Sequence, residues 1–203
     1  MKTIFATTGF ALALATAGIV TAGNSVAAVP AAVSSTCSTC HGADGISSVS
    51  TFPNLAGQEK SYLETQLKAF RDHSRADARA QAYMWGIAGP LSDSSISALA
   101  TYFSEQAPAA GQPVADAALV AQGKAIFDNG VASQGIPACQ SCHGAQAQGM
   151  ATFPRLAGQH RTYLVQQLMA FHDGSRQNAI MNANVKNMTE AQAQAVAAYI
   201  HTQ

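Results

Sequence analysis

The sequence predicts an all-α protein that consists of two tandem copies of one small fold. Apolar residues recur with the period of an α-helix in both halves, and no segment alternates with the period of a β-strand. The run Phe52–Gln58 recurs as Phe153–Gln159, at an offset of 101 residues. Such self-similarity indicates a duplicated domain, and a chain of 203 residues is long enough for two.

The first segment of the chain is expected to be a secretory signal peptide. Lys2 precedes an apolar run from Ile4 to Val20, and sites with small residues suited to cleavage follow between residues 22 and 28. The alternative is an uncleaved membrane anchor, although the run is short for a span across a bilayer. We therefore expect residues 1–28 to be removed on export, which in a bacterium delivers the protein to the periplasm.

The mature chain is expected to contain two domains, residues 29–106 and residues 116–203. Between them, residues 107–115 are rich in Pro, Ala and Gly and show no apolar period, so they predict an interdomain linker. Each domain is small for a self-sufficient hydrophobic core.

Two helices are expected in each half. The first carries an apolar stripe at i, i+4 and i+7, made of Leu63, Leu67 and Phe70 and, in the second half, of Leu164, Leu168 and Phe171. The last helix opens at Ser92, with Ile96, Leu99, Ala100 and Phe103 on one face. Its counterpart opens at Thr189 with Gln192 as a capping box, and has a stripe of Val196, Ala197 and Ile200.

Each half also contains one Cys-x-x-Cys-His motif, and the two motifs use all four cysteines of the chain. They consist of Cys37, Cys40 and His41 in the first half and of Cys139, Cys142 and His143 in the second. This motif is typical of c-type haem, which is attached through two thioethers and bound at its iron by the histidine. The sequence therefore predicts two covalently bound haem c groups, which would supply apolar volume to two small cores.

Three other interpretations of the cysteines fit the sequence less well. A thioredoxin-like Cys-x-x-Cys needs a strand–helix context and has no adjacent histidine. A structural zinc site does not explain a histidine at the same place in both motifs. A disulfide within each motif would be strained and would close a very short loop.

The repeat singles out Met84 and Met181 as the second axial ligands of the two irons. Met84 precedes Leu91 by seven residues and Met181 precedes Met188 by seven, and both are expected in a loop ahead of the last helix. A methionine thioether raises the reduction potential of a haem and suits an electron carrier.

The remaining methionines and histidines have no equivalent in the other half. Met150, Met169 and Met188 are expected to fill gaps in the core. His73, His160, His172 and His201 are expected at the surface, with His73 and His172 as alternative ligands.

Four pairs of residues are candidates for supporting roles around the haems. The carbonyls of Pro53 and Pro154 are expected to accept the Nδ1–H of the two motif histidines. Arg75 and Arg176 are expected either to pair with haem propionates or to lie in solvent. Tyr62 and Tyr163, with Gln58 and Gln159, are expected to bind propionates, to line the seam between the domains, or only to pack.

Together these features resemble the cytochrome c4 family of dihaem class I cytochromes. The resemblance covers nearly the whole mature chain. It rests on the two Cys-x-x-Cys-His-Gly motifs, the two Phe-Pro-x-Leu-Ala-Gly-Gln-x-x-x-Tyr-Leu runs and the spaced methionines. It implies two class I cytochrome c domains related by pseudo-twofold symmetry, haems that face each other across a propionate-bridged interface, and His/Met ligation of both irons.

The two halves depart from this symmetry in two places. The second half has a full amino-terminal helix, Ala117 to Phe127, with Gly123 and Phe127 placed to meet the last helix. The segment before Cys37 is only a weak counterpart, so we expect a looser first haem pocket with a different potential. The second half lacks four residues between Phe171 and Met181, which alters the loop expected there.

The resemblance implies a periplasmic electron carrier that delivers electrons to a terminal oxidase or exchanges them with a cytochrome reductase complex. Only 11% of the residues are charged and the formal net charge is zero, which argues against a nucleic-acid partner. Residues 29–108 carry a formal charge of −2 and residues 109–203 a charge of +1, which would orient docking. Peripheral membrane association is compatible with this sequence, and no oligomer is required.

Two other functions are alternatives to a free electron carrier. The chain would also suit the dihaem subunit of a periplasmic dehydrogenase complex, with the catalytic site on another polypeptide. A catalytic haem protein would need an open axial position, and the matched methionines argue against one. We therefore expect no enzymatic activity of the chain itself.

Overall fold

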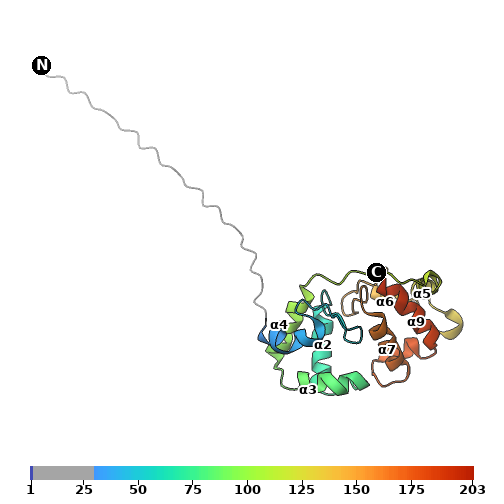
Figure 1. Cartoon of the computed structure of the whole chain (residues 1–203), viewed down its shortest axis with the longest axis horizontal. Helices are drawn as coiled ribbons and strands as arrows, with labels where there is room; N and C mark the ends of the chain where they lie inside the picture. Colours follow the sequence, from blue (N-terminus) through green and yellow to red (C-terminus); the bar gives the residue numbers. More distant parts are fainter. Residues whose placement is uncertain (2–29) are drawn as a thin grey trace.

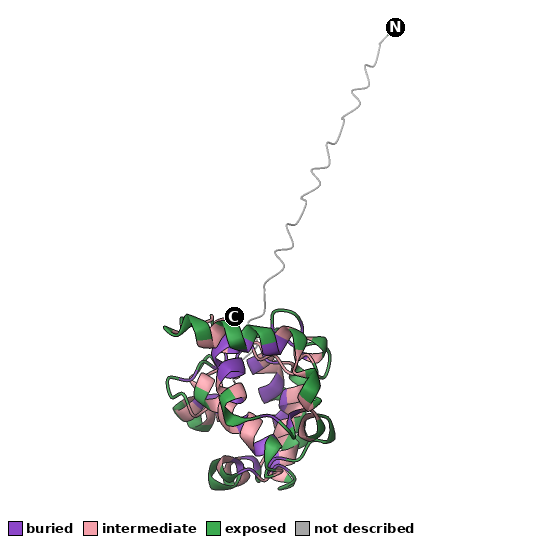
Figure 2. Ribbon diagram, turned by 90° about the vertical axis from the view of Figure 1, so that its right-hand side faces the viewer, coloured by how far each residue is buried: buried purple, intermediate pink, exposed green. Residues whose placement is uncertain are grey.

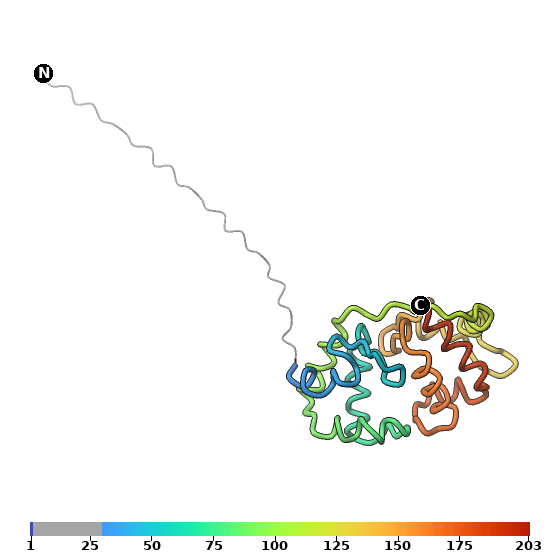
Figure 3. The backbone as a smooth tube through the Cα atoms, viewed as in Figure 1, coloured from blue at the N-terminus to red at the C-terminus, as the bar shows by residue number. Residues whose placement is uncertain are grey.

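The computed structural model describes Met1 and residues 30–203, so the expected signal peptide, apart from Met1, lies outside the described residues. Two lobes of helices stand side by side, one formed by the first half of the chain and one by the second (Figures 1 and 3). The described residues form helices and two isolated β-bridges, with no β-strand among them. The predicted all-α, two-domain fold is thus confirmed.

The first lobe contains six short or medium helical segments. They are η1 (Val33–Cys37), α1 (Ser38–His41), α2 (Lys60–Arg71), η2 (Ala80–Met84), α3 (Trp85–Ala88) and α4 (Asp93–Ser104). The second lobe contains α5 (Ala117–Asn129), η3 (Ala132–Gln134), α6 (Gln140–His143), α7 (Arg161–His172), α8 (Ala179–Val185) and α9 (Glu190–His201). None of the helices within residues 30–203 is long and apolar enough to cross a membrane.

The core of the first lobe forms where α2 packs on α4. The apolar stripe of α4 is buried as expected, and Ser92 caps this helix by accepting a hydrogen bond from the Ser95 amide. Val33, 1% exposed, packs into the same cluster as Leu63 and Phe103. The weak amino-terminal segment of the first half therefore still contributes one buried side chain to the core.

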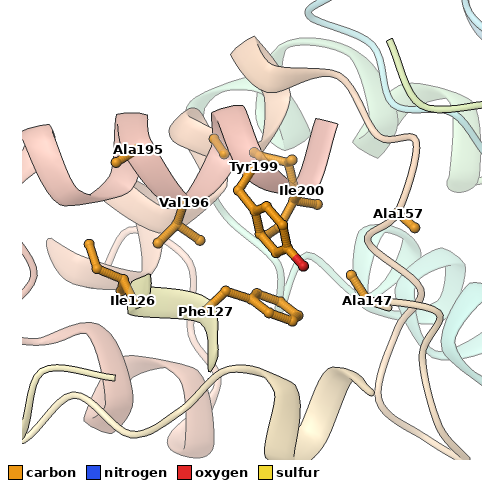
Figure 4. Close-up of a cluster of buried hydrophobic side chains, with 10 residues drawn as sticks. Ile126, Phe127, Ala147, Ala157, Ala195, Val196, Tyr199 and Ile200 are labelled. Atoms are coloured by element: carbon orange, nitrogen blue, oxygen red, sulfur yellow. The ribbon is translucent and has the colours of Figure 1, made fainter. Parts of the chain in front are cut away.

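The core of the second lobe forms where α5 crosses α9. Gly123 permits this crossing, because a Cβ atom at that position would lie 1.9 Å from the carbonyl oxygen of Ala195. Phe127 is fully buried and its ring centroid lies 5.3 Å from that of Tyr199 (Figure 4). Thr189 and Gln192 form the expected capping box at the start of α9.

Two expectations about methionines are wrong. Met84 and Met181 do not lie in loops: Met84 ends η2 and Met181 lies within α8. Asn178 caps α8 by accepting from the amides of Ile180 and Met181, so this segment becomes helical although it is short. Met150 does not fill a gap in the core but is 51% exposed, beside a tight turn in which its amide donates to the Phe153 carbonyl.

Buried residues lie in the interior of the molecule, while exposed residues cover most of the outside (Figure 2). No helix lies between α4 and α5. Within that segment the Gln112 amide donates to the carbonyl of His201, which holds the chain beside the end of α9 (Figure 3).

Candidate haem-binding sites

Each Cys-x-x-Cys-His motif forms one helical turn that ends at its histidine. His41 closes α1 and His143 closes α6, and both imidazoles are buried. The glycine that follows each histidine has a positive φ, and at Gly42 a Cβ atom would lie 2.2 Å from the Ile46 carbonyl oxygen. A glycine is therefore required for the chain to turn away at this point.

The two motif histidines are held in the same way. His41 Nδ1 lies 2.9 Å from the carbonyl oxygen of Pro53, and His143 Nδ1 lies 3.0 Å from that of Pro154. This confirms the prediction for both prolines. Burial lowers the pKa of each histidine, although the hydrogen bond to the carbonyl opposes this effect. Each imidazole is thus neutral, with Nδ1–H donated and Nε2 free to bind a metal.

A cavity lies beside each histidine. The first has a volume of about 270 Å³ and is lined by Cys37, Cys40, His41 and Met84 together with apolar side chains. The second has a volume of about 790 Å³, and its lining includes Cys139, Cys142, His143 and Met181. Each cavity therefore brings together the four residues that the sequence analysis assigned to one haem.

No disulfide joins the two cysteines of either motif, which argues against the disulfide interpretation. Among the described residues, no group of three or more His, Cys, Asp and Glu side chains could hold a metal ion, which argues against the zinc interpretation.

Met188 also lines the second cavity, so the structure offers two thioethers there. Its place in the first half is taken by Leu91, which lines the first cavity and has no atom that could bind a metal. The internal repeat therefore favours Met181 over Met188 as the ligand.

The four unmatched histidines do not line either cavity. His172 Nδ1 contacts the Val185 carbonyl, His160 Nε2 contacts the Ser47 carbonyl of the other half, and His73 stacks on Trp85 with 4.1 Å between ring centroids. None of these positions supports an alternative axial ligand.

A polar cluster of buried and half-buried side chains joins the two cavities at the interface between the lobes. We call it the seam cluster; it consists of Tyr62, Gln66, Arg75, Tyr163, Gln167 and Arg176. Arg75 and Arg176 are 7% and 5% exposed, so the expectation that they lie in solvent is wrong. Their burial could not be foreseen from one half alone, because each guanidinium reaches across to the other lobe.

The seam cluster repeats the pseudo-twofold symmetry of the chain. The Gln66 amide oxygen accepts from Arg75 and from Arg176, each at 2.8 Å. The Gln167 amide oxygen accepts from the same two guanidinium groups, at 2.8 and 2.6 Å. The hydroxyl of Tyr163 accepts from Arg75 and that of Tyr62 from Arg176.

A second symmetric contact lies beside the seam cluster. The Gln58 side chain donates to the carbonyl of Arg155 and accepts from its amide, at 2.8 Å in both cases. Gln159 makes the same pair of bonds to the backbone of Asn54, at 2.9 Å. Of the roles expected for these glutamines and for Tyr62 and Tyr163, lining the seam is therefore the one that the structure shows.

The donor set and the charges of the cavities fit haem. Apolar walls suit a porphyrin, paired cysteines suit its thioether links, and a neutral imidazole with a thioether suits six-coordinate iron. The seam cluster brings together two buried guanidinium charges, and within residues 30–203 only that of Arg75 has a carboxylate partner, Asp77. In addition, the buried Nε of Arg155, in the wall of the first cavity, has no hydrogen-bond partner among the described residues. These guanidinium groups are suited to pair with the carboxylates of haem propionates.

Sequence reasoning missed Asp77, which forms the ion pair with Arg75, and the bridging role of Gln66 and Gln167. The two glutamines recur at the offset of the repeat, as do Arg75 and Arg176. Polar residues that recur while neighbouring surface positions diverge are the signal that could have indicated a shared buried contact.

Comparison with known proteins agrees with this geometry. The Cytochrome c family model matches residues 26–106 and again residues 120–203. The chain is 49% identical to cytochrome c-552 of Acidithiobacillus ferridurans over 88% of this chain and 78% of that protein. It is 39% identical to cytochrome c4 of Pseudomonas aeruginosa, over 91% and 88%, and 40% identical to a thiosulfate dehydrogenase electron acceptor of Thiomonas intermedia, over 95% and 90%.

Two solved structures share the arrangement of the two lobes. Cytochrome c4 of Acidithiobacillus ferrooxidans superimposes with a TM-score of 0.79 and 48% identity, covering 82% of this chain and 98% of that chain. A thiosulfate dehydrogenase from Marichromatium purpuratum superimposes with a TM-score of 0.73 and 34% identity, covering 82% of this chain and 36% of that longer chain. The likeness therefore extends to both lobes and to nearly all of the described residues.

Proposed function

The chain belongs to the cytochrome c family and is a dihaem electron-transfer protein of the cytochrome c4 group, and from this premise we propose that it is an exported, freely diffusing electron carrier. It carries two covalently bound haem c groups. When bound, each haem iron takes up and releases one electron as it alternates between the ferric and ferrous states. Its partners are redox proteins.

We assign one haem to each half. Cys37 and Cys40 anchor the first and His41 and Met84 bind its iron; Cys139, Cys142, His143 and Met181 do the same for the second. The domains that hold them are residues 29–106 and 116–203, with residues 107–115 as linker. Export to the periplasm through a signal peptide at residues 1–28 agrees with haem attachment outside the cytoplasm.

The observation that carries this assignment is the composition of the two cavity walls. Each wall contains one histidine fixed by a proline carbonyl and one methionine at the matching place of the repeat. A methionine thioether on iron stabilises the ferrous form and leaves no open position for substrate. The chain is therefore suited to exchange electrons and to have no catalytic activity of its own.

The axial ligands can be tested by substitution. Met84→Ala and Met181→Ala should each remove half of the iron–methionine charge-transfer absorption of the oxidised protein and lower one reduction potential. Met188→Ala is the matched control, because Met188 lines the second cavity beside Met181. The assignment of Met181 is wrong if Met188→Ala, and not Met181→Ala, removes the band.

A second candidate function is that of a dihaem subunit or dedicated acceptor of a dehydrogenase. The similarity to a thiosulfate dehydrogenase electron acceptor, and to about a third of a thiosulfate dehydrogenase chain, favours it. Purification of the tagged protein from its native host distinguishes the two functions. A carrier should elute at the size of the single chain, whereas a subunit should copurify with a stoichiometric partner. Only elution at the size of the single chain agrees with transient electron exchange with a terminal oxidase or a reductase complex.

A further inference from the structure

Two equivalent positions of the repeat carry different residues beside the two haem cavities. Asp77 and Asn178 are related by the offset of 101 that also relates Arg75 to Arg176. Asp77 accepts from the Ala80 amide at the start of the helical segment that leads to Met84. Asn178 caps α8 in the same way, ahead of Met181. The two side chains are nearly the same size, but only one carries a charge.

Asp77 is a buried carboxylate. Its side chain is 6% exposed, and its Oδ2 lies 2.9 Å from Nε of Arg75, whose side chain is 8% exposed. Burial alone would raise the pKa of Asp77, but the charge and the hydrogen bond of Arg75 hold it below its ordinary value. The carboxylate is therefore ionised at neutral pH.

The two charges of this ion pair are distributed differently between the two cavities. Arg75 lines both cavities and its guanidinium reaches Gln66 in one half and Gln167 in the other. Asp77 lines only the first cavity, and Asn178 lines only the second. The positive charge is thus shared between the two sites, whereas the negative charge belongs to the first.

We propose that Asp77 lowers the reduction potential of the first haem and so makes the two redox sites inequivalent. This inference rests on the proposed function, with one haem in each cavity. A ferric haem carries one more positive charge than a ferrous one, so a nearby buried carboxylate stabilises the ferric form. The low dielectric of a buried site strengthens the effect, and the asparagine of the second half provides no such charge.

Other charged side chains lining the first cavity act in the opposite direction. Arg79 and Arg155 line the first cavity only, and both are partly exposed to solvent. The second cavity has Arg176, which is buried and has no carboxylate partner among the described residues. We therefore compare the reduction potential of each haem before and after the charge at position 77 or 178 is altered, with these arginines left in place.

The test exchanges the two residues in the holoprotein. Asp77→Asn keeps the shape and the capping oxygen but removes the charge, and should raise the potential of the first haem. Asn178→Asp should lower that of the second. For each variant we expect about a tenfold change in the equilibrium constant for moving an electron between the haems, equal to about 59 mV for a one-electron couple. Potentials follow from spectroelectrochemical titration, and NMR contacts of each haem with Phe103 or Ile200 assign the two waves.

Asp77→Glu is the matched control, because it keeps the charge while moving the cap. In Asp77→Glu the reduction potential of the first haem should differ less from the wild-type value than it does in Asp77→Asn. The inference is overturned if Asp77→Asn leaves the first potential unchanged, if both haems shift equally, or if Asp77→Glu shifts it as far as Asp77→Asn. If Asp77→Asn does not fold, the test is the potential of the second haem in Asn178→Asp, which should fall. The proposed function itself fails differently, by the absence of two one-electron waves in the wild type.

Discussion

The imidazoles of His41 and His143 are each held by a proline carbonyl, and this contact decides which ring nitrogen is free. The residues that touch the cofactor could be predicted from the sequence because the motif and its spacing are local. The proline carbonyls could also be predicted, because the repeat places Pro53 and Pro154 at nearly the same distance after their histidines. Asp77 was missed, because its importance depends on burial and on Arg75, neither of which is visible in the sequence.

The Asp77–Arg75 ion pair should make the stability of the folded protein depend on pH. The folded-state pKa of Asp77 lies below its unfolded value of about 3.9. The pair therefore contributes its full stability above about pH 4 and loses it as the pH falls through the folded-state pKa. Between about pH 5 and pH 2, the wild type should lose more free energy of unfolding than Asp77→Asn, as measured by denaturant titration. Parallel losses in the two proteins would contradict this prediction.

Among the helices, the crossing of α5 over α9 shows how one residue controls the packing of an element. Gly123 brings the backbones together so closely that a methyl group would meet the Ala195 carbonyl. This contact was predicted from the placement of Gly123 and Phe127, because the helical period is strong there. The helices at Ser92 and Thr189 were also predicted, because their caps are local signals. The helical placement of Met84 and Met181 was not, because these segments are short and show no clear apolar period.

Substitution of this glycine should be costly. Gly123→Ala should lower the free energy of unfolding by about 1–3 kcal/mol or more, since overpacking forces backbone shifts. Gly86→Ala is the matched control: Gly86 lies in α3, and a Cβ atom there would have no neighbour within 4 Å. It should gain about 0.5–1 kcal/mol from higher helix propensity. Equal effects of the two substitutions on thermal unfolding would show that the close approach does not limit packing.

For the whole molecule, the two lobes are joined by contacts that one half cannot reveal. The seam cluster and the paired glutamines Gln58 and Gln159 connect atoms about a hundred residues apart. The sequence showed that these residues recur, but not that each pairs with the backbone or side chain of the other copy. The burial of two arginines at this interface follows from the docking of the lobes, and each arginine alone resembles a surface residue.

Removal of either glutamine side chain should weaken the interface. Gln58→Ala leaves the part-buried backbone amide and carbonyl of Arg155 unpaired, and Gln159→Ala leaves the buried ones of Asn54 unpaired. Each change should cost about 1–3 kcal/mol. Gln81→Ala is the control, because Gln81 is exposed and bonds only within its own lobe. Thermal unfolding of the holoprotein should show similar losses for the first two and almost none for the third. A large loss for one glutamine alone would contradict the symmetric arrangement.

The central claim is that each lobe holds one haem whose iron is bound by a histidine and a methionine. Its most direct test is a spectroelectrochemical titration of the purified mature protein that follows the haem spectra and the iron–methionine charge-transfer band. The structure predicts two high-potential one-electron waves, with the band present for both oxidised haems. A single wave, a low-potential haem or a high-spin haem would contradict the claim and would show that Met84 or Met181 is not a ligand.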